Sequence, residues 1–236
     1  MTKQLSLPVT LRDTETFDSF VVGNNEQLVS TLIGLTNQAN NPPDTPWLTF
    51  ISGDTGVGKS HLLYALCQQA QNTAHSCVYL NLNDKESFSL EMLEDLEHSQ
   101  VICLDDIDAL QGSKTWQIGV FDLINRVKEN GRSRLVITAS ASPKNLELEL
   151  ADLISRLSWG LSYKLCALDD EQRSEALIKR AEQRGLNMPK KVAKYLVNHW
   201  RRDMPALMNT LEKLDVISLQ EQRKLTIPFV KTALNL

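Results

Sequence analysis

The residues whose types and spacing carry the clearest chemistry form one glycine-rich run, Gly53-Asp54-Thr55-Gly56-Val57-Gly58-Lys59-Ser60. It matches the pattern of a glycine, any four residues and then Gly-Lys-Ser, whose backbone N–H groups surround a nucleotide phosphate. In this pattern Lys59 reaches the terminal phosphates and the Ser60 hydroxyl holds Mg²⁺. Residues 47–51 favour a strand and residues 61–67 favour a helix, whose positive end would face the anion. Because both flanks fit, we favour a phosphate loop over an ordinary glycine turn.

A pair of acids follows the wholly apolar run 101–104, which is typical of a buried parallel strand. An acid at the carboxyl end of such a strand, beside the phosphate-loop strand, is where a Mg²⁺-orienting carboxylate lies. Asp105 would act on the metal through Ser60 and water, and Asp106 could polarise an attacking water. Acidic pairs after strands are also common helix N-caps, but the upstream phosphate loop favours the metal role.

Three other polar residues each allow two interpretations. Thr138 and Ser140 end the next buried strand, where a polar group would lie beside the γ-phosphate or would simply begin a loop. Arg156 precedes the last expected strand and is either a solvated surface residue or an arginine finger toward a neighbouring subunit. The finger is chemically reasonable because a guanidinium stabilises the charge of phosphoryl transfer.

The N-terminal residues 1–13 form a short polar arm that contains Gln4-Leu5-Ser6-Leu7-Pro8. Its leucines have no core of their own, and Pro8 favours an extended chain. A peptide of this kind suits a docking pocket, with the glutamine as polar anchor and the leucines as plugs. An edge strand folded onto the body is an equally good interpretation on physical grounds.

Composition limits the compartment and the partners. The net charge of -4 argues against nonspecific DNA binding, which needs a basic surface. No run approaches the ~18 apolar residues of a membrane span, and the start lacks a signal-peptide pattern. The four cysteines fall in apolar strand or helix stretches without a Cys-x-x-Cys pair, so we expect reduced core thiols. We therefore expect a cytoplasmic protein without a membrane partner.

The elements that must position these residues alternate between strand and helix. We expect strands at 47–51, 76–82, 100–104, 134–138 and 161–168, and helices at 26–38, 61–67, 87–98, 115–130 and 150–157. Such alternation predicts an α/β fold with a parallel sheet. After Asp169 we expect only helices, at 171–184, 189–201, 204–222 and 228–236. The predicted division is an arm at 1–13, an α/β domain at 14–168 and a smaller all-α domain at 169–236.

Several of these segments resemble the DnaA/Hda family of AAA+ proteins. The resemblance is carried by the entry segment 16–25, the phosphate loop, Leu104-Asp105-Asp106, the segment 155–160 and the helical lid, and it covers about residues 14 to 236. DnaA itself continues into a helix-turn-helix DNA-binding domain, for which we expect no room after Leu236. Residues 4–8 and 223–231 resemble the regulatory branch of the family, which carries a clamp-binding peptide at its N-terminus.

The resemblance implies an AAA+ P-loop module that negatively regulates the initiation of chromosomal replication. Its clamp-binding residues would be Gln4, Leu5, Ser6, Leu7 and Pro8. On a DNA-loaded sliding clamp, it would stimulate ATP hydrolysis by the ATP form of DnaA, with Arg156 as a finger in trans and Asp106 as a second catalytic candidate. Direct sequence-specific DNA binding is not expected, and a homo-oligomer is possible. The alternatives are an ATP-hydrolysing loader or remodeller, and a DnaA-like initiator acting on DNA.

Two departures from the DnaA pattern bear on turnover. Pro205 stands where the family carries a sensor arginine in the third lid helix, and nearby Arg201 and Arg202 cannot be assumed to replace it. Ser140 stands where DnaA has an acidic residue. Both changes weaken detection of a γ-phosphate, so we expect ADP to be favoured over ATP and little turnover by this chain itself.

The expected ligand residues can be named in full. The metal would be Mg²⁺, held by Ser60 and Asp105. The residues expected to bind the nucleotide are Val21, Val22, Gly53, Asp54, Thr55, Gly56, Val57, Gly58, Lys59, Ser60, His61, Thr138, Ser140 and Pro205.

Overall fold

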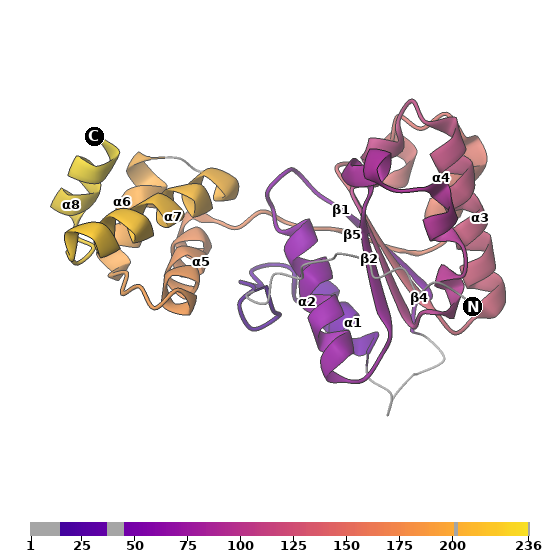
Figure 1. Ribbon diagram of the computed structural model, residues 1–236, viewed down its shortest axis with the longest axis horizontal. Coiled ribbons are helices and arrows are strands. Elements are labelled where there is room, and N and C mark those ends of the chain that lie inside the picture. The colour runs from indigo at the N-terminus through magenta and orange to yellow at the C-terminus, as the bar shows by residue number, and fades with distance from the viewer. Residues whose placement is uncertain (1–14, 37–44, 201–202, 236) are drawn as a thin grey trace.

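The protein folds into two bodies, an α/β domain and a helical bundle, joined by a single connection (Figure 1). The computed structural model describes residues 15–36, 45–200 and 203–235. Gln4, Leu5, Ser6, Leu7 and Pro8 lie outside the described residues, as do Arg201 and Arg202. Among the described helices, none is long and apolar enough to cross a membrane.

The α/β domain is built on a five-stranded sheet in the order β2-β3-β4-β1-β5, in which every paired strand is parallel. The strands are β1 (Leu48–Ser52), β2 (Cys77–Asn81), β3 (Val101–Asp105), β4 (Arg134–Ala139) and β5 (Leu161–Lys164). All five residues of β3 are buried, as its unbroken apolar run predicts for a strand covered on both faces. The predicted parallel sheet is therefore confirmed.

Helices cover both faces of the sheet (Figure 1). α1 (Glu26–Gly34) and α2 (Lys59–Asn72) pack on one face, and α3 (Lys114–Asn130) and α4 (Ala151–Leu157) pack on the other. Alternation along the strands divides the core: Val101 and Cys103 join the α1–α2 side, whereas Ile102 and Leu104 join the α3–α4 side.

The expected helix at 87–98 is wrong. The chain instead makes three short 3₁₀ turns, η2 (Leu82–Ser87), η3 (Leu90–Leu93) and η4 (Leu96–His98). Leu90, Leu93 and Leu96 stand three residues apart, a spacing that 3₁₀ turns place on one side. Leu93 and Leu96 are buried in the core, and Asp95 between the last two turns has φ 62°, which an α-helix does not allow. Two further 3₁₀ turns are η5 (Ile107–Leu110) and η6 (Pro143–Asn145).

The helical lid consists of α5 (Asp170–Gln183), α6 (Lys190–His199), α7 (Met204–Glu221) and α8 (Ile227–Leu234). It has a core of its own, which includes Leu177, Leu196, Leu211 and Phe229. α5 begins with a capping box, in which Asp169 and Gln172 satisfy each other's backbone N–H groups. The predicted α/β core followed by a helical lid is confirmed.

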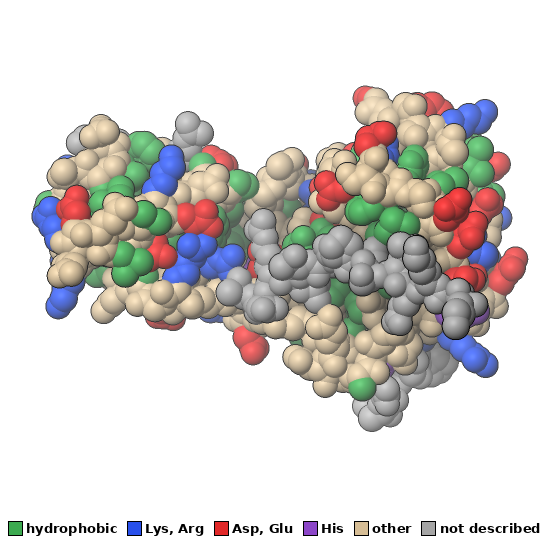
Figure 2. Space-filling view, viewed as in Figure 1, with side chains coloured by type: hydrophobic (Ala, Val, Ile, Leu, Met, Phe, Trp, Pro, Cys, Tyr) green, Lys and Arg blue, Asp and Glu red, His purple; other side chains and the backbone are tan. Residues whose placement is uncertain are grey.

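The four cysteines are free thiols, and they differ in burial. Cys67 and Cys103 are buried and Cys77 is half-buried, as expected of core thiols, but Cys166 is exposed. That part of the expectation is wrong because Cys166 follows the edge strand β5, whose own residues are mostly exposed. On the face drawn in Figure 2, the described basic side chains form no band across both bodies, in keeping with the net charge of -4.

Candidate functional site

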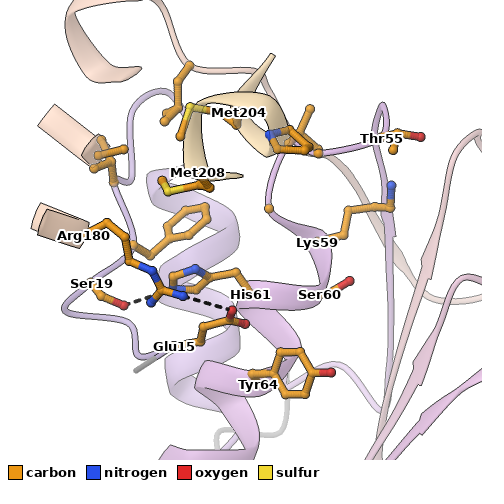
Figure 3. A pocket seen from close by; sticks show the side chains of 18 of the residues that line it. Glu15, Ser19, Thr55, Lys59, Ser60, His61, Tyr64, Arg180, Met204 and Met208 are labelled. Atoms are coloured by element: carbon orange, nitrogen blue, oxygen red, sulfur yellow. Dashed lines mark hydrogen bonds and ion pairs between the residues drawn. The ribbon is translucent and has the colours of Figure 1, made fainter. Parts of the chain in front are cut away.

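A cleft of about 560 Å³ lies where the carboxyl ends of the strands meet the lid. Its walls come from the entry segment, the phosphate loop, α2 and the lid helices α5 and α7, and Figure 3 shows these side chains converging. Of the residues predicted to bind nucleotide, the cleft is lined by Val21, Thr55, Gly56, Val57, Gly58, Lys59, Ser60, His61 and Pro205. Asp106 lines it as well.

The phosphate loop takes the backbone shape that its glycines allow. Gly56 has φ 80° and Gly58 has φ 109°, values that favour glycine, and Gly58 is the N-cap of α2. The Lys59 side chain is buried, and its Nζ donates to the carbonyl oxygens of Gly53 at 2.8 Å and Asp54 at 3.2 Å. The N-terminus of a 14-residue helix and an ammonium therefore meet at this loop, which is the chemistry of an anion site.

The lid touches the loop through the first turn of α7. The Pro205 ring lies so close to Gly56 that a Cβ on the glycine would stand 2.5 Å from its Cγ and Cδ. Met204 and Met208 line the same wall (Figure 3). The first turn of α7 thus presents apolar side chains to the loop, and the polar Asn209 and Glu212 line the cleft further along the helix. The nearby basic group Arg184 is paired with Glu212 at 2.6 Å.

The two aspartates at the end of β3 have different surroundings. Asp105 is fully buried, and its carboxylate accepts hydrogen bonds from the Tyr79 hydroxyl at 2.8 Å and from the Thr138 hydroxyl. Thr138 Oγ1 also accepts the backbone N–H of Asp106 at 2.9 Å. Thr138 therefore joins the two acids beneath the cleft and is not among the residues that line it.

Asp106 is the acid that reaches the cleft. Its φ of 56° turns it out of the strand direction, and Asn83 Nδ2 donates to its carboxylate at 2.9 Å. Burial and then the neighbouring charge of Asp105 raise the pKa of the Asp106 carboxyl, whereas Lys59 acts in the opposite direction.

Ser140 is not brought to the cleft. Its backbone N–H and its hydroxyl both donate to the carboxylate of Asp108, at 2.8 and 2.5 Å. Both residues line a second cavity of about 260 Å³. We expected Ser140 to contact the nucleotide, but the structure places it outside the cleft. Asp108 of η5 holds it there through the hydrogen bonds to the turn that follows β4. Val22, Gly53 and Asp54 also lie outside the lining of the main cleft.

Arg156 lies on α4, on the face of the sheet opposite α2, and is not among the residues of the cleft. Its Nε donates to Asn125 Oδ1 at 2.7 Å, and its guanidinium carbon stands 3.9 Å from the centre of the Trp159 ring. The same guanidinium carbon lies 5.4 Å from the centre of the Phe121 ring. Among the described residues, none accepts a hydrogen bond from its terminal Nη groups, and Trp159 is 44% exposed.

Sequence reasoning missed one wall of the cleft. Arg180 of α5 forms an ion pair with Glu15 at 3.7 Å, which links the lid to the entry segment (Figure 3). His61 Nε2 lies 3.0 Å from the Thr16 carbonyl and 3.1 Å from Ser19 Oγ, and burial lowers the pKa of its imidazole. These partners are far apart in the chain, so the sequence gives no local signal for their meeting.

A stacked tyrosine pair was missed as well. The rings of Tyr64 on α2 and Tyr79 on β2 lie 4.6 Å apart, and both residues line the cleft. The spacing of an apolar helix face and strand face would have suggested a contact between these elements, but not which aromatic residues meet.

Two protein-family models match the chain. The bacterial DnaA ATPase domain matches residues 11–164, and the Hda lid domain matches residues 170–234. Domain III of the Thermotoga maritima replication initiation protein DnaA is 24% identical with a TM-score of 0.81, over 95% of this chain and 97% of that one.

Two further solved structures are similar. AMPPCP-bound DnaA from Aquifex aeolicus is 21% identical with a TM-score of 0.70, over 86% of this chain and 65% of that one. The Thermotoga maritima RuvB Holliday junction branch migration motor is 15% identical with a TM-score of 0.66, over 94% and 71%. At these identities the solved structures show a shared fold.

Proposed function

The chain belongs to the DnaA/Hda family of AAA+ proteins, and on that premise we propose that it is a nucleotide-bound regulator of DnaA that restrains the initiation of chromosomal replication. The observation that carries this proposal is the pairing of a DnaA-type ATPase domain with an Hda-type lid in one chain. An AAA+ core with this lid is expected to act on a DnaA partner, as a cytoplasmic protein.

The residues present fit a nucleotide phosphate and its metal. The loop glycines leave a cradle that side chains would fill, since a Cβ at Gly58 would stand 3.0 Å from the Phe20 ring. Lys59 supplies a cation, and the helix N-terminus supplies N–H donors. Ser60 and Asp106 line the cleft and offer the hydroxyl and carboxylate oxygens that Mg²⁺ prefers, whereas Asp105 is buried beneath them and would act on the metal only indirectly. When bound, the nucleotide and metal would supply a fixed polyanion that joins the core to the lid.

We propose that the cleft favours ADP over ATP and turns over slowly. Recognition of a γ-phosphate needs positive charge, but the lid group beside Gly56 is the uncharged Pro205 ring. The lid arginines that line the cleft, Arg180 and Arg184, are paired with Glu15 and Glu212. Ser140 is held by Asp108 and does not line the cleft. The bound nucleotide would then act as a structural ligand for this chain rather than as its substrate.

Arg156 is proposed to act in trans on the ATP of DnaA. A finger needs a guanidinium held in a fixed plane with donors left over for the partner's phosphate. The Asn125 hydrogen bond and the Trp159 stack fix the plane, and the Nη groups donate to none of the described residues. Its place on α4, across the sheet from α2, favours action on a neighbour.

The arm Gln4-Leu5-Ser6-Leu7-Pro8 is proposed to bind a DNA-loaded sliding clamp, on sequence evidence alone. Binding both partners would bring Arg156 to DnaA at a high effective concentration. Clamp binding would therefore multiply the stimulation without any new contact to DnaA.

The experiment measures phosphate release by this chain alone, by DnaA alone, and by both with DNA-loaded clamp. We expect slow release in the first two mixtures and fast release in the third. The double variant Gln4→Ala, Leu5→Ala should lose the fast release and clamp co-elution while its nucleotide affinity stays normal. Fast release by the chain alone would instead favour an ATP-hydrolysing loader or remodeller.

A further inference from the structure

Three cysteine thiols that the proposed function does not use lie together behind the nucleotide cleft. Cys67 belongs to α2, Cys77 is the first residue of β2, and Cys103 belongs to β3. Their sulfur atoms all lie within 4.8 Å of one another. The Cys67 and Cys77 sulfurs are 2.9 Å apart, and the Cys67 and Cys103 sulfurs are 3.8 Å apart.

The fold brings Cys67 and Cys77 together as part of a larger contact between the same two elements. Tyr64, three residues before Cys67 on α2, stacks on Tyr79, two residues after Cys77 on β2. A helix repeats a face at three to four residues and a strand repeats one at two, so the tyrosine pair and the cysteine pair share one interface. The ring stack therefore holds the two sulfurs at short range.

We propose that Cys67 and Cys77 form a reversible disulfide on the helix that follows the phosphate loop. Closing the pair from 2.9 Å to the roughly 2.05 Å of a disulfide bond needs only a small shift of two side chains. The oxidant is a hydroperoxide: two thiols and one hydroperoxide give the disulfide, an alcohol and water. The sulfurs lose two electrons and two protons, and the O–O bond accepts them as it breaks.

Exposure and acidity favour reaction at this pair. Cys77 is half-buried and gives small oxidants a route, whereas Cys67 and Cys103 are closed off from solvent. Hydrogen bonding with the Cys103 and Cys77 thiols lowers the pKa of Cys67 against the opposing effect of burial. The Cys103 hydrogen bond lowers the pKa of Cys77, but the Cys67 hydrogen bond and burial outweigh it and raise that pKa. Cys67 is thus the more acidic thiol of the pair, and Cys77 is the one that a small oxidant reaches.

The surroundings favour a disulfide over a bound metal ion. Among the described residues, the group that could hold an ion here consists of three thiols, and a structural zinc site uses four ligands. Three thiolates around a divalent cation would leave a net negative charge in the apolar core that packs around Cys67 and Cys103. Burying such a charge is costly, whereas a disulfide is neutral.

The tryptic map of this chain makes the test direct. Cys67 and Cys77 lie on one peptide, 60–85, and Cys103 lies on the next, 86–114. In a Cys166→Ser background, the folded protein is treated with hydrogen peroxide, alkylated, digested and weighed. We expect peptide 60–85 to lose two hydrogen atoms, to resist alkylation and to recover both thiols after reduction in a glutathione buffer.

Variants and stability supply the controls. Cys103→Ala should keep the linked peptide, whereas Cys67→Ala and Cys77→Ser should each abolish it. Because the bond closes a short loop, oxidation should raise the melting temperature by about 5–10 °C in the Cys166→Ser protein and leave Cys77→Ser unchanged. Alkylation of both cysteines in 60–85 after oxidation, a dominant cross-link to 86–114, or stoichiometric zinc that protects the thiols would each overturn the proposal.

Discussion

The nucleotide cleft and the surface around Arg156 lie on opposite sides of one sheet, and their charged groups are held differently. In the cleft, Lys59 is bonded by two loop carbonyls and Arg180 is paired with Glu15. Around Arg156, one hydrogen bond and the rings of Trp159 and Phe121 fix the guanidinium, and its Nη donors reach no described acceptor.

This contrast separates two uses of charge. Groups bonded within their own chain hold a ligand and join the core to the lid, so their loss should change binding and stability. A fixed guanidinium whose Nη donors meet no acceptor among the described residues is suited to act on a partner, so its loss should change that partner's chemistry.

The largest effect is expected from Arg156→Ala. Stimulation of DnaA's ATP hydrolysis should fall by roughly 10³–10⁵, the worth of an arginine finger, while ADP binding and clamp binding stay near normal. Arg156→Lys should restore little, since a point charge cannot reproduce the planar fork. The assay is single-turnover hydrolysis with DNA-loaded clamp.

Arg132→Ala is the matched control for this variant, because Arg132 is an exposed arginine just after α3. It should leave the stimulation unchanged. Equal losses from Arg132→Ala and Arg156→Ala would mean that general positive charge, rather than a finger, drives the effect.

Lys59→Ala should abolish the stabilisation that ADP gives. At about a hundred times its dissociation constant a ligand stabilises by roughly 2.7 kcal/mol, and this increment should vanish in the variant. The measurement is the ADP-induced shift in melting temperature, which cancels any cost of removing a buried side chain. A full shift in the variant would reject the phosphate-loop site.

Pro205→Arg should raise the preference for ATP over ADP. A charged hydrogen bond to the γ-phosphate is worth about 1.5–3 kcal/mol, or roughly tenfold to a hundredfold in the affinity ratio. Pro205→Ala removes the ring without adding charge and should leave the ratio as it is. Folding should tolerate both, since proline is not required in a first turn. Titration calorimetry with both nucleotides gives the ratio, and no change with arginine would place the γ-phosphate elsewhere.

The smallest effect is expected from Asn125→Ala, which removes the hydrogen bond that orients Arg156. The Trp159 stack remains, so stimulation should fall by about tenfold, corresponding to roughly 1.4 kcal/mol. Affinity for DnaA should hold while the rate at saturation drops. A loss as large as that of Arg156→Ala would show that Asn125 does more than position the guanidinium.

Local patterns in the sequence were sufficient to predict the sheet and the phosphate loop. The apolar run at β3 and the Gly-Lys-Ser ending depend on neighbours in the chain, so periodicity and motif reveal them. The 3₁₀ turns η3 and η4 were missed because Leu90, Leu93 and Leu96 also fit one face of an α-helix. Only burial under α3 and the left-handed Asp95 decide between the two.

The sequence could not predict which distant residues contact one another at the site. The bond from Ser140 to Asp108 and the pair Arg180–Glu15 join segments that meet only in the fold. The same holds for Asn125, which gives Arg156 its orientation from a different helix. A motif indicates which chemistry a residue can perform. Whether its side chain is bonded within the chain or can contact a partner depends on residues from distant segments.

Separate labels on the two nucleotides distinguish hydrolysis on DnaA from hydrolysis in this chain's own cleft. DnaA is loaded with ATP carrying one radioactive label, this chain with ATP carrying another, and the two are mixed with DNA-loaded clamp for a single turnover. We predict rapid conversion of the DnaA label to ADP, little conversion of this chain's label, and loss of the first conversion with Arg156→Ala. Rapid conversion of this chain's own label, with the DnaA label unchanged, would contradict the account.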